Sequence, residues 1–292
     1  MAFLTERTLM KVRALCLVAG TIILGGCSTQ AAGKPSPTAT APASPPTPGS
    51  TAASNPTGAA TTSSPTAVVV ASGDPFQTGM TYLRRRQYSA AAVQFRRAIT
   101  AHQHLAESYA GLGGAEMGQS RFSSAYTAYQ HAASLKPTTQ LYLYETAYAA
   151  LYAQNFRQSV VYTTRLLRLN PYSVAAYHLQ MQAYSRLYQP KMALIDAKRI
   201  VRLKPKNAEA YDDLGIALAN TQHDEAALNA FSTAIRLDPH RYNYFSNRAV
   251  VEHLLKDKAA AIADFAEAEK LAPDAKTKST FAAIVAELKK TH

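Results

Sequence analysis

The sequence predicts an all-α fold: an α-solenoid of about six stacked helical hairpins and a C-terminal capping helix, preceded by a disordered linker. Three observations support this prediction. Proline recurs every 34 residues, at Pro137, Pro171, Pro205, Pro239 and Pro273. Each of these prolines follows a leucine that stands two residues earlier. Between them, apolar residues recur at spacings of three and four, the period of an amphipathic helix. A constant period of this length indicates one supersecondary unit that is repeated and stacked.

The N-terminal segment, residues 1–26, has the features of a lipoprotein signal peptide. Three basic residues precede a twelve-residue apolar run, Ala14 to Gly25, which is too short to span a bilayer because a spanning helix needs about 20 residues. The string Leu24-Gly25-Gly26-Cys27 follows. It resembles the bacterial lipoprotein box, which implies that Cys27 becomes the first mature residue and carries lipid, including palmitate. An ordinary signal peptide with a nearby cysteine is the alternative.

Residues 27–72 are predicted to form a disordered tether. From Ser28 to about Ser72 the chain consists of Ala, Thr, Ser, Pro and Gly with few other residues and a single charge, Lys34. Such a stretch has too little apolar side chain to offset the entropy lost on ordering. Its role is either to give the anchored domain reach or to act as a passive spacer. Threonine- and proline-rich stalks of this kind can also be O-glycosylated.

The repeat domain is predicted over residues 73–292. Its repeats are expected at about 72–105, 106–139, 140–173, 174–207, 208–241 and 242–275, and a capping helix at 276–290. With each proline counted as position 32, large side chains stand at positions 4 and 24 and small ones at positions 8, 20 and 27, as Tyr211, Phe231 and Gly215 illustrate. Two such helices form an antiparallel hairpin in which small residues face large ones. Proline ends the second helix because it lacks an amide hydrogen.

The repeats are not equally regular. The first has Gln103 in place of the proline. The repeat that begins at Gln140 departs most, with Thr146, Ser159 and Thr163 at positions that are apolar or small elsewhere, and we expect its hairpin to pack less tightly.

This pattern of large, small and proline positions resembles the tetratricopeptide repeat (TPR) family, over about 220 residues. The resemblance implies a concave groove lined by the first helix of each repeat, through positions 2, 5, 9, 12 and 13, where extended peptides or partner helices bind. In the repeat that begins at Gln140 these positions include Tyr144, Tyr148 and Tyr152, which share one helical stripe. Later repeats contribute His178, Gln182, Arg186, Asp212 and Asn243.

A wall of this composition could stack on proline or sugar rings and hydrogen-bond a peptide backbone. The alternative is that the three tyrosines pack between repeats, since tyrosine serves as core filling elsewhere in the chain. The tyrosines expected at core positions are Tyr82, Tyr109, Tyr129, Tyr177, Tyr184 and Tyr211.

Charge and cysteine content narrow the function classes. The formal net charge is +12, of which +9 falls in the repeat region. Basic runs such as Lys198-Arg199 could attract phosphate polymers or anionic lipid, or they are solvated helix faces; because an exported protein meets little nucleic acid, no nucleic-acid partner is expected. The only cysteine besides Cys27 is Cys16, inside the signal segment. The mature chain therefore has no cysteine nucleophile and no thiolate metal site.

No motif points to catalysis or to a cofactor. The lysine and asparagine pattern of the TPR carboxylate clamp is missing. His102 and His104 are the only close histidine pair and lack further ligands nearby. Glu209, Asp212 and Asp213 are expected on one exposed helix, where an acidic patch that faces a partner or plain solvation is a better explanation than acid–base chemistry. We expect neither an enzyme nor a cofactor.

Two hypotheses remain for the function. The first is a lipid-anchored scaffold or adaptor of the bacterial cell envelope that binds a protein or peptide segment in its groove, in a layout similar to the pilotin lipoproteins of pilus and secretion assembly. The second is a carbohydrate-binding or polysaccharide-export accessory protein. Either is expected outside the cytoplasm, at the periplasmic face of an outer membrane or at the outer face of a single plasma membrane.

Overall fold

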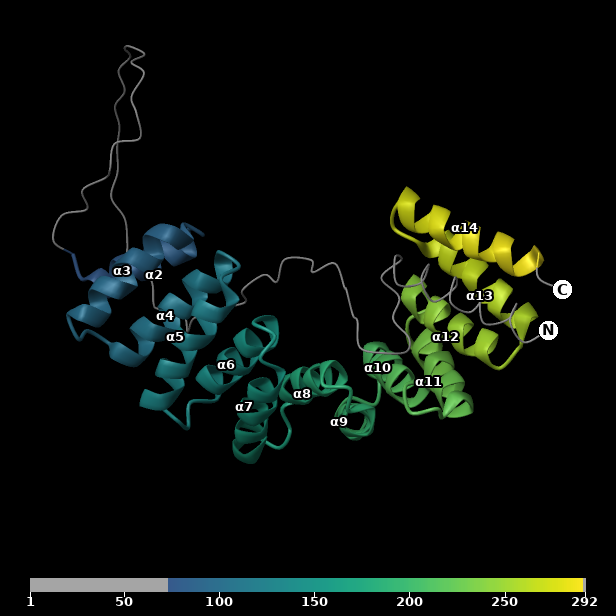
Figure 1. The fold of residues 1–292 in the computed structure, drawn as a ribbon, viewed down its shortest axis with the longest axis horizontal. Helices are drawn as coiled ribbons and strands as arrows, with labels where there is room; N and C mark the ends of the chain where they lie inside the picture. The colour runs from purple at the N-terminus through teal and green to yellow at the C-terminus, as the bar shows by residue number, and fades with distance from the viewer. Residues whose placement is uncertain (1–72, 291–292) are drawn as a thin grey trace, which may run out of the picture. The chain divides into compact units, whose positions relative to one another are not determined.

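The computed structural model describes residues 73–290; the predicted signal peptide, Cys27 and the linker lie outside them. These residues form thirteen helices and no strand (Figure 1). The helices are α2 (Pro75–Arg84), α3 (Tyr88–Thr100), α4 (Leu105–Gly118), α5 (Phe122–Leu135), α6 (Gln140–Tyr152), α7 (Phe156–Leu169), α8 (Val174–Arg186), α9 (Pro190–Leu203), α10 (Ala208–Ala219), α11 (Asp224–Leu237), α12 (Tyr242–Leu254), α13 (Lys258–Leu271) and α14 (Ala275–Lys290).

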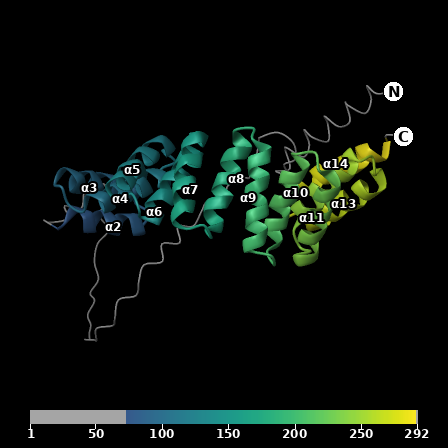
Figure 2. The same ribbon diagram turned by 90° about the horizontal axis from the view of Figure 1, so that it is seen from below.

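The twelve helices from α2 to α13 form six consecutive hairpins, and α14 follows them. We call the first helix of each hairpin the A helix (α2, α4, α6, α8, α10 and α12) and the second the B helix. Each helix packs against the next along the chain, as both ribbon views show (Figure 1; Figure 2). The A helices also contact one another in the pairs α2 with α4, α6 with α8 and α10 with α12. The predicted fold class and number of hairpins are confirmed.

The turn inside every hairpin has the same backbone conformation. One residue in each turn adopts the left-handed region, with φ between 57° and 65°: Arg86, Ser120, Gln154, Tyr188, Gln222 and Lys256. These residues are 34 positions apart, so the backbone repeats with the period of the sequence. The amide of the next residue bonds back to the last turn of the A helix, as Gln87 N does to Tyr82 O at 2.9 Å. None of the six is glycine, so each turn retains backbone strain.

Small residues on A helices face aromatic rings on B helices, as the sequence predicts. A Cβ atom built at Gly215 of α10 would lie 2.5 Å from Cε1 of Phe231 on α11, and one at Gly79 would lie 2.9 Å from Cε1 of Phe95. Both phenylalanines are fully buried. The rings therefore occupy the space that a side chain at position 8 would need, and this close approach holds the two helices of a hairpin together.

The tyrosine core differs from the expected one. Among the six tyrosines expected to be buried, Tyr129 is buried, whereas the other five are half-buried. Three tyrosines that were not expected in the core are buried instead: Tyr142, Tyr162 and Tyr244. The expectation took only positions that are large in TPR repeats. The long ring at those positions extends past the hairpin core and leaves its hydroxyl end near solvent.

The hairpin of α6 and α7 buries the three polar residues that distinguish its sequence. Thr146, Ser159 and Thr163 are all fully buried. The threonine hydroxyls donate to carbonyls one turn earlier, Thr146 to Tyr142 and Thr163 to Ser159. Because most of these hydroxyls have acceptors inside their own helix, the hairpin forms despite its polar positions; whether it packs less tightly than the others stays a prediction.

The last helix covers the final hairpin. Phe281, Ile284, Val285 and Leu288 of α14 are buried against α12 and α13, where the ring of Phe265 lies 6.2 Å from that of Phe281. This confirms the capping helix, which begins one residue earlier than predicted. None of the helices among residues 73–290 is long and apolar enough to cross a membrane.

Candidate functional site

An apolar and aromatic stripe runs along the A helix α6. Leu141 at its start is 59% exposed and Tyr152 at its end is 39% exposed, while Tyr144 and Tyr148 between them are half-buried. The ring centroids of Tyr144 and Tyr148 are 6.2 Å apart, and those of Tyr148 and Tyr152 are 4.7 Å apart. Eleven residues of helix rise about 16 Å, so the stripe has the length of a short peptide segment. We call Leu141, Tyr144, Tyr148 and Tyr152 the α6 stripe.

The two inner tyrosines of the stripe contribute to packing as well as to the surface. Tyr144 and Tyr148 pack against the core around α6 and α7. Burial is the main factor that raises the pKa of both hydroxyls, so they stay neutral and act as hydrogen-bonding groups. The inner rings therefore pack, as one of the two alternatives expected, while partner binding through the exposed ends of the stripe stays a prediction.

The Tyr152 end of the stripe borders a shallow, open depression. The ring of Tyr152 lies 5.4 Å from the ring of Phe122, which begins α5 of the preceding hairpin. The depression is lined by the α4–α5 turn and the start of α5, residues 120–124, together with Tyr152, Ala153 and Gln154. Two successive hairpins therefore shape one surface beside Tyr152.

A chain of polar contacts joins the A helices α8, α10 and α12. Nε2 of His178 on α8 lies 3.3 Å from Oδ2 of Asp213 on α10. On α12, Asn243 and Asn247 each donate an amide hydrogen to a different carboxylate oxygen of Asp212, at 3.3 Å and 2.9 Å. The structure therefore brings His178, Asp212 and Asn243, three of the residues predicted for the groove, into one network through Asp213 and Asn247.

Of the two carboxylates of this network, Asp212 is buried and Asp213 is half-buried, which corrects the expectation of an exposed acidic helix. Asp212 is only 6% exposed. Burial raises its pKa to about 7 against the opposing effect of the two asparagine hydrogen bonds, and burial together with the charges of Asp212 and Glu209 raises the pKa of Asp213 well above its usual value. Burial also lowers the pKa of His178. Asp212 and Asp213 face the neighbouring A helices, while Glu209 at the start of α10 is the exposed carboxylate.

The two remaining predicted residues lie on α8. Gln182 and Arg186 are half-buried on the same helix as His178, four and eight residues further along. They share its A-helix stripe because four residues make about one helical turn.

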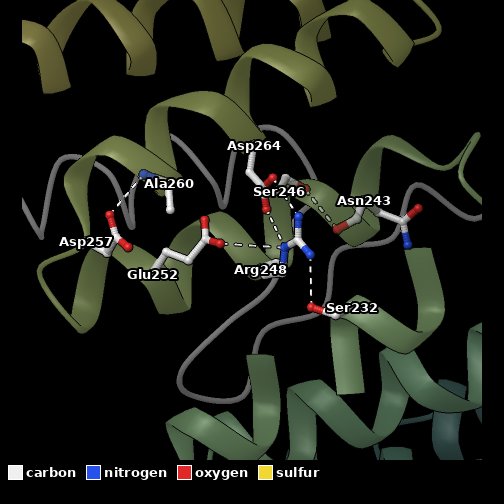
Figure 3. A network of polar contacts seen from close by, with 8 residues as sticks. All are labelled: Ser232, Asn243, Ser246, Arg248, Glu252, Asp257, Ala260 and Asp264. Atoms are coloured by element: carbon white, nitrogen blue, oxygen red, sulfur yellow. Dashed lines mark hydrogen bonds and ion pairs between the residues drawn. The ribbon is translucent and has the colours of Figure 1, made fainter. Parts of the chain in front are cut away.

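A second polar network sits between α11, α12 and α13 and was not predicted from the sequence (Figure 3). Arg248 of α12 donates from Nε and Nη2 to the two carboxylate oxygens of Asp264 on α13, at 2.7 Å and 2.9 Å, and from Nη1 to Ser232 of α11 at 2.9 Å. Its Nε also lies 3.6 Å from Oε1 of Glu252. This forked pairing ties three helices together. Because Arg248 already pairs with Asp264 and lies near Glu252, these charges are not available to a ligand, and we interpret the network as structural.

Comparisons with known proteins agree with this architecture. The family model for the tetratricopeptide repeat matches residues 208–241, which hold α10 and α11. Solved structures with the same fold include MamA from residue 41 onward of Desulfovibrio magneticus RS-1, with a TM-score of 0.55, 21% identity and coverage of 57% of this chain and 95% of that one. YrrB, described as a TPR protein with an unusual peptide-binding site, has a TM-score of 0.54, 21% identity and coverage of 68% of this chain and 98% of that one.

The helix pair α10 and α11 is thus a tetratricopeptide repeat, and residues 73–290 have the fold of tetratricopeptide repeat proteins. The matched segment is one repeat, and the same helix pair recurs five more times with the same turn geometry. A third TPR structure, from Parabacteroides merdae ATCC 43184, has a TM-score of 0.52 and 14% identity and covers 73% of this chain and 83% of its own. No curated protein matches the sequence significantly.

The α6 stripe and the network across α8, α10 and α12 both belong to A helices. The part of the chain that the structure describes contains no group of three or more His, Cys, Asp or Glu residues placed to hold a metal ion. The α6 stripe presents exposed apolar and aromatic side chains at its two ends, whereas Asp212 and Asn247 of the network are buried.

Proposed function

We propose that this protein is a scaffold that binds a segment of another protein against its A helices, with the α6 stripe as the main contact. The observation that supports this is the exposure of Leu141 and Tyr152 at the two ends of one A-helix stripe. Exposed apolar and aromatic side chains in line are the anchors that extended peptides and amphipathic helices use. The neighbouring polar groups of α8 and α10, such as Glu209, can then hydrogen-bond or pair with the rest of the segment.

Carbohydrate binding is less well supported. A sugar ring stacks on an exposed aromatic face, but Tyr144 and Tyr148 are half-buried and turn toward their neighbouring rings. Among the stripe's rings only Tyr152 is exposed. One exposed ring at the end of the stripe offers too little aromatic surface for a polysaccharide chain, so a protein segment is the better-supported ligand.

The test is co-purification of partners with the full chain from detergent-solubilised membranes. The double substitution Leu141→Ser and Tyr152→Ser removes both exposed ends of the stripe, and Leu135→Ser, which alters an exposed apolar residue at the end of the B helix α5, is the matched control. We expect the double variant to lose a protein that wild type and Leu135→Ser retain. Equal recovery from all three chains would place the binding face elsewhere.

We further propose that the protein is a lipoprotein of the bacterial cell envelope, anchored through Cys27 and held outside the cytoplasm. The support is the basic and apolar N-terminal segment followed by Leu24-Gly25-Gly26-Cys27. In cells fed radiolabelled palmitate, wild type should incorporate label and the Cys27→Ser variant should not. Label that remains in Cys27→Ser, or its absence from wild type, would reject the anchor without affecting the binding face.

A further inference from the structure

The positive charge of the repeat domain is concentrated in one quarter of it. Residues 156–207, from α7 to just beyond α9, contain ten Lys and Arg residues and a single acidic residue, Asp196, for a net charge of +9. The flanking parts of the domain, residues 73–155 and 208–292, carry +3 and −3. The net charge of the whole repeat region is thus the charge of this segment.

The B helices α7 and α9 place these charges at matching repeat positions. Positions 18, 22, 26 and 29 are Arg157, Val161, Arg165 and Arg168 in α7, and Lys191, Ile195, Arg199 and Arg202 in α9. In the next B helix, α11, the same positions are Glu225, Asn229, Thr233 and Arg236. Among the described B helices, α3 shares part of the pattern with Val93 and Arg97, but only α7 and α9 carry basic residues at positions 18, 26 and 29 around an apolar one at position 22.

Most side chains of this surface are exposed, Arg165 being half-buried, and the basic ones form no ion pair with the described residues. Val161 and Ile195 are 48% and 59% exposed. Among residues 73–290, none of the ion pairs found involves a basic residue of α7 or α9; Arg165 stacks over Tyr162, and Arg199 donates to the hydroxyl of Tyr177. Asp196, the single carboxylate, is buried on the inner side of α9.

Further exposed apolar and aromatic groups belong to the same two hairpins and their connecting turn. Met192 on α9 and Leu169 at the end of α7 are 41% and 45% exposed. Tyr172 and Tyr188, in the turns before and after α8, are 76% and 73% exposed. Tyrosine is enriched where protein meets the headgroup layer of a bilayer, because its ring is apolar and its hydroxyl is polar.

We propose that the outer face of α7 and α9 docks on an anionic lipid bilayer. The lysine and arginine head groups would reach lipid phosphates, while Val161, Met192 and Ile195 enter the boundary between headgroups and acyl chains. A soluble phosphate polymer would use the charges but would leave the apolar side chains in water, so the mixture of both favours a membrane. This surface lies on B helices and does not depend on partner binding by the A helices.

The test measures how much protein sediments with vesicles made of equal parts of phosphatidylglycerol and phosphatidylcholine. Every sample is the full chain with Cys27→Ser, so that no lipid is attached. One variant adds Lys191→Glu, Lys198→Glu and Arg202→Glu; its control carries Lys278→Glu, Lys289→Glu and Lys290→Glu on α14, with the same change in net charge. Since each basic side chain near an anionic surface contributes about fivefold in affinity, and each new carboxylate is repelled, we expect the α9 variant to bind at least about 100-fold more weakly and the control to bind within about threefold of the parent.

A second variant separates a membrane from a polymer. Val161→Ser with Ile195→Ser keeps every charge. We expect it to bind the vesicles about tenfold more weakly, while its affinity for polyphosphate stays that of the parent chain. Unchanged vesicle binding by this variant would overturn the membrane proposal in favour of an anionic polymer, and equal losses in the α9 and α14 charge variants would overturn the assignment to this face. Should the triple Glu variant lose its helical circular dichroism, the same positions changed to Gln provide the comparison.

Discussion

Asp196 on α9 is a buried carboxylate that weakens the fold at neutral pH. It is 5% exposed, its Oδ2 atom has no hydrogen-bond partner, and burial raises its pKa from 3.8 to about 7. The equivalent position, 23 of the repeat, is Ala128 in α5 and Ala230 in α11. The fold therefore accepts alanine there, and Asp196→Ala should stabilise the protein.

The sign and size of this change in stability follow from the coupling between protonation of Asp196 and folding. A carboxyl whose pKa is higher in the folded than in the unfolded chain binds its proton more tightly when folded, so its cost is absent below about pH 4 and grows as the pH rises to about 7. A shift of about three pKa units corresponds to about 4 kcal/mol, which solvent near the surface reduces to about 2 to 3 kcal/mol. Asp196→Ala should thus raise the free energy of unfolding by this amount at pH 8 and change it by less than about 1 kcal/mol at pH 4.

Asp264 on α13 is the matched control, because it occupies the same repeat position but is paired with Arg248. Asp264→Ala leaves that arginine without its forked partner and should lower the free energy of unfolding by about 2 to 4 kcal/mol. Both variants can be compared with wild type by urea titration at pH 4, 6 and 8, provided that the dependence on urea is unchanged. A destabilising Asp196→Ala at pH 8, or a gain that is equally large at pH 4, would refute the reasoning.

Two further predictions concern packing and turns. Gln222→Gly should stabilise the protein by about 0.5 to 1 kcal/mol, because Gln222 holds a left-handed φ of 63° that glycine adopts without strain; Asn220→Gly, two residues earlier at φ −66°, is the control and should not stabilise. Gly215→Val should lower the free energy of unfolding by about 1 to 3 kcal/mol or more, because the Phe231 ring already fills the space beside that Cα atom; thermal unfolding that matches wild type would contradict this close packing.

The fold could be predicted from the sequence because its determinants are local and repeated. Proline ends each of five B helices, and a small residue opposite a ring, such as Gly215 opposite Phe231, recurs at fixed spacing. The left-handed turns escaped prediction since no glycine marks them: Gln222 and Lys256 occupy the conformation without the residue type that signals it. Tertiary packing imposes that conformation on the chain.

The candidate site was predictable only in part. The sequence period correctly placed Tyr152 and His178 on A helices, because the period alone fixes which helix of a hairpin each residue belongs to. The burial of Asp212 and the pairing of His178 with Asp213 depend on contacts between hairpins. Single-repeat patterns do not contain that information, because the position that Asp212 occupies is half-buried in α8, at His178, and buried in α10.

The most direct test of the central claim, that the A helices bind a protein partner, is site-specific photocrosslinking in cells. A benzophenone amino acid is placed at position 152, in the exposed end of the α6 stripe, or at position 127, an exposed threonine on the B helix α5. We predict a discrete protein adduct from position 152 and none from position 127. An adduct from position 127 alone, or none from either position while the protein still co-purifies with a partner, would contradict the account.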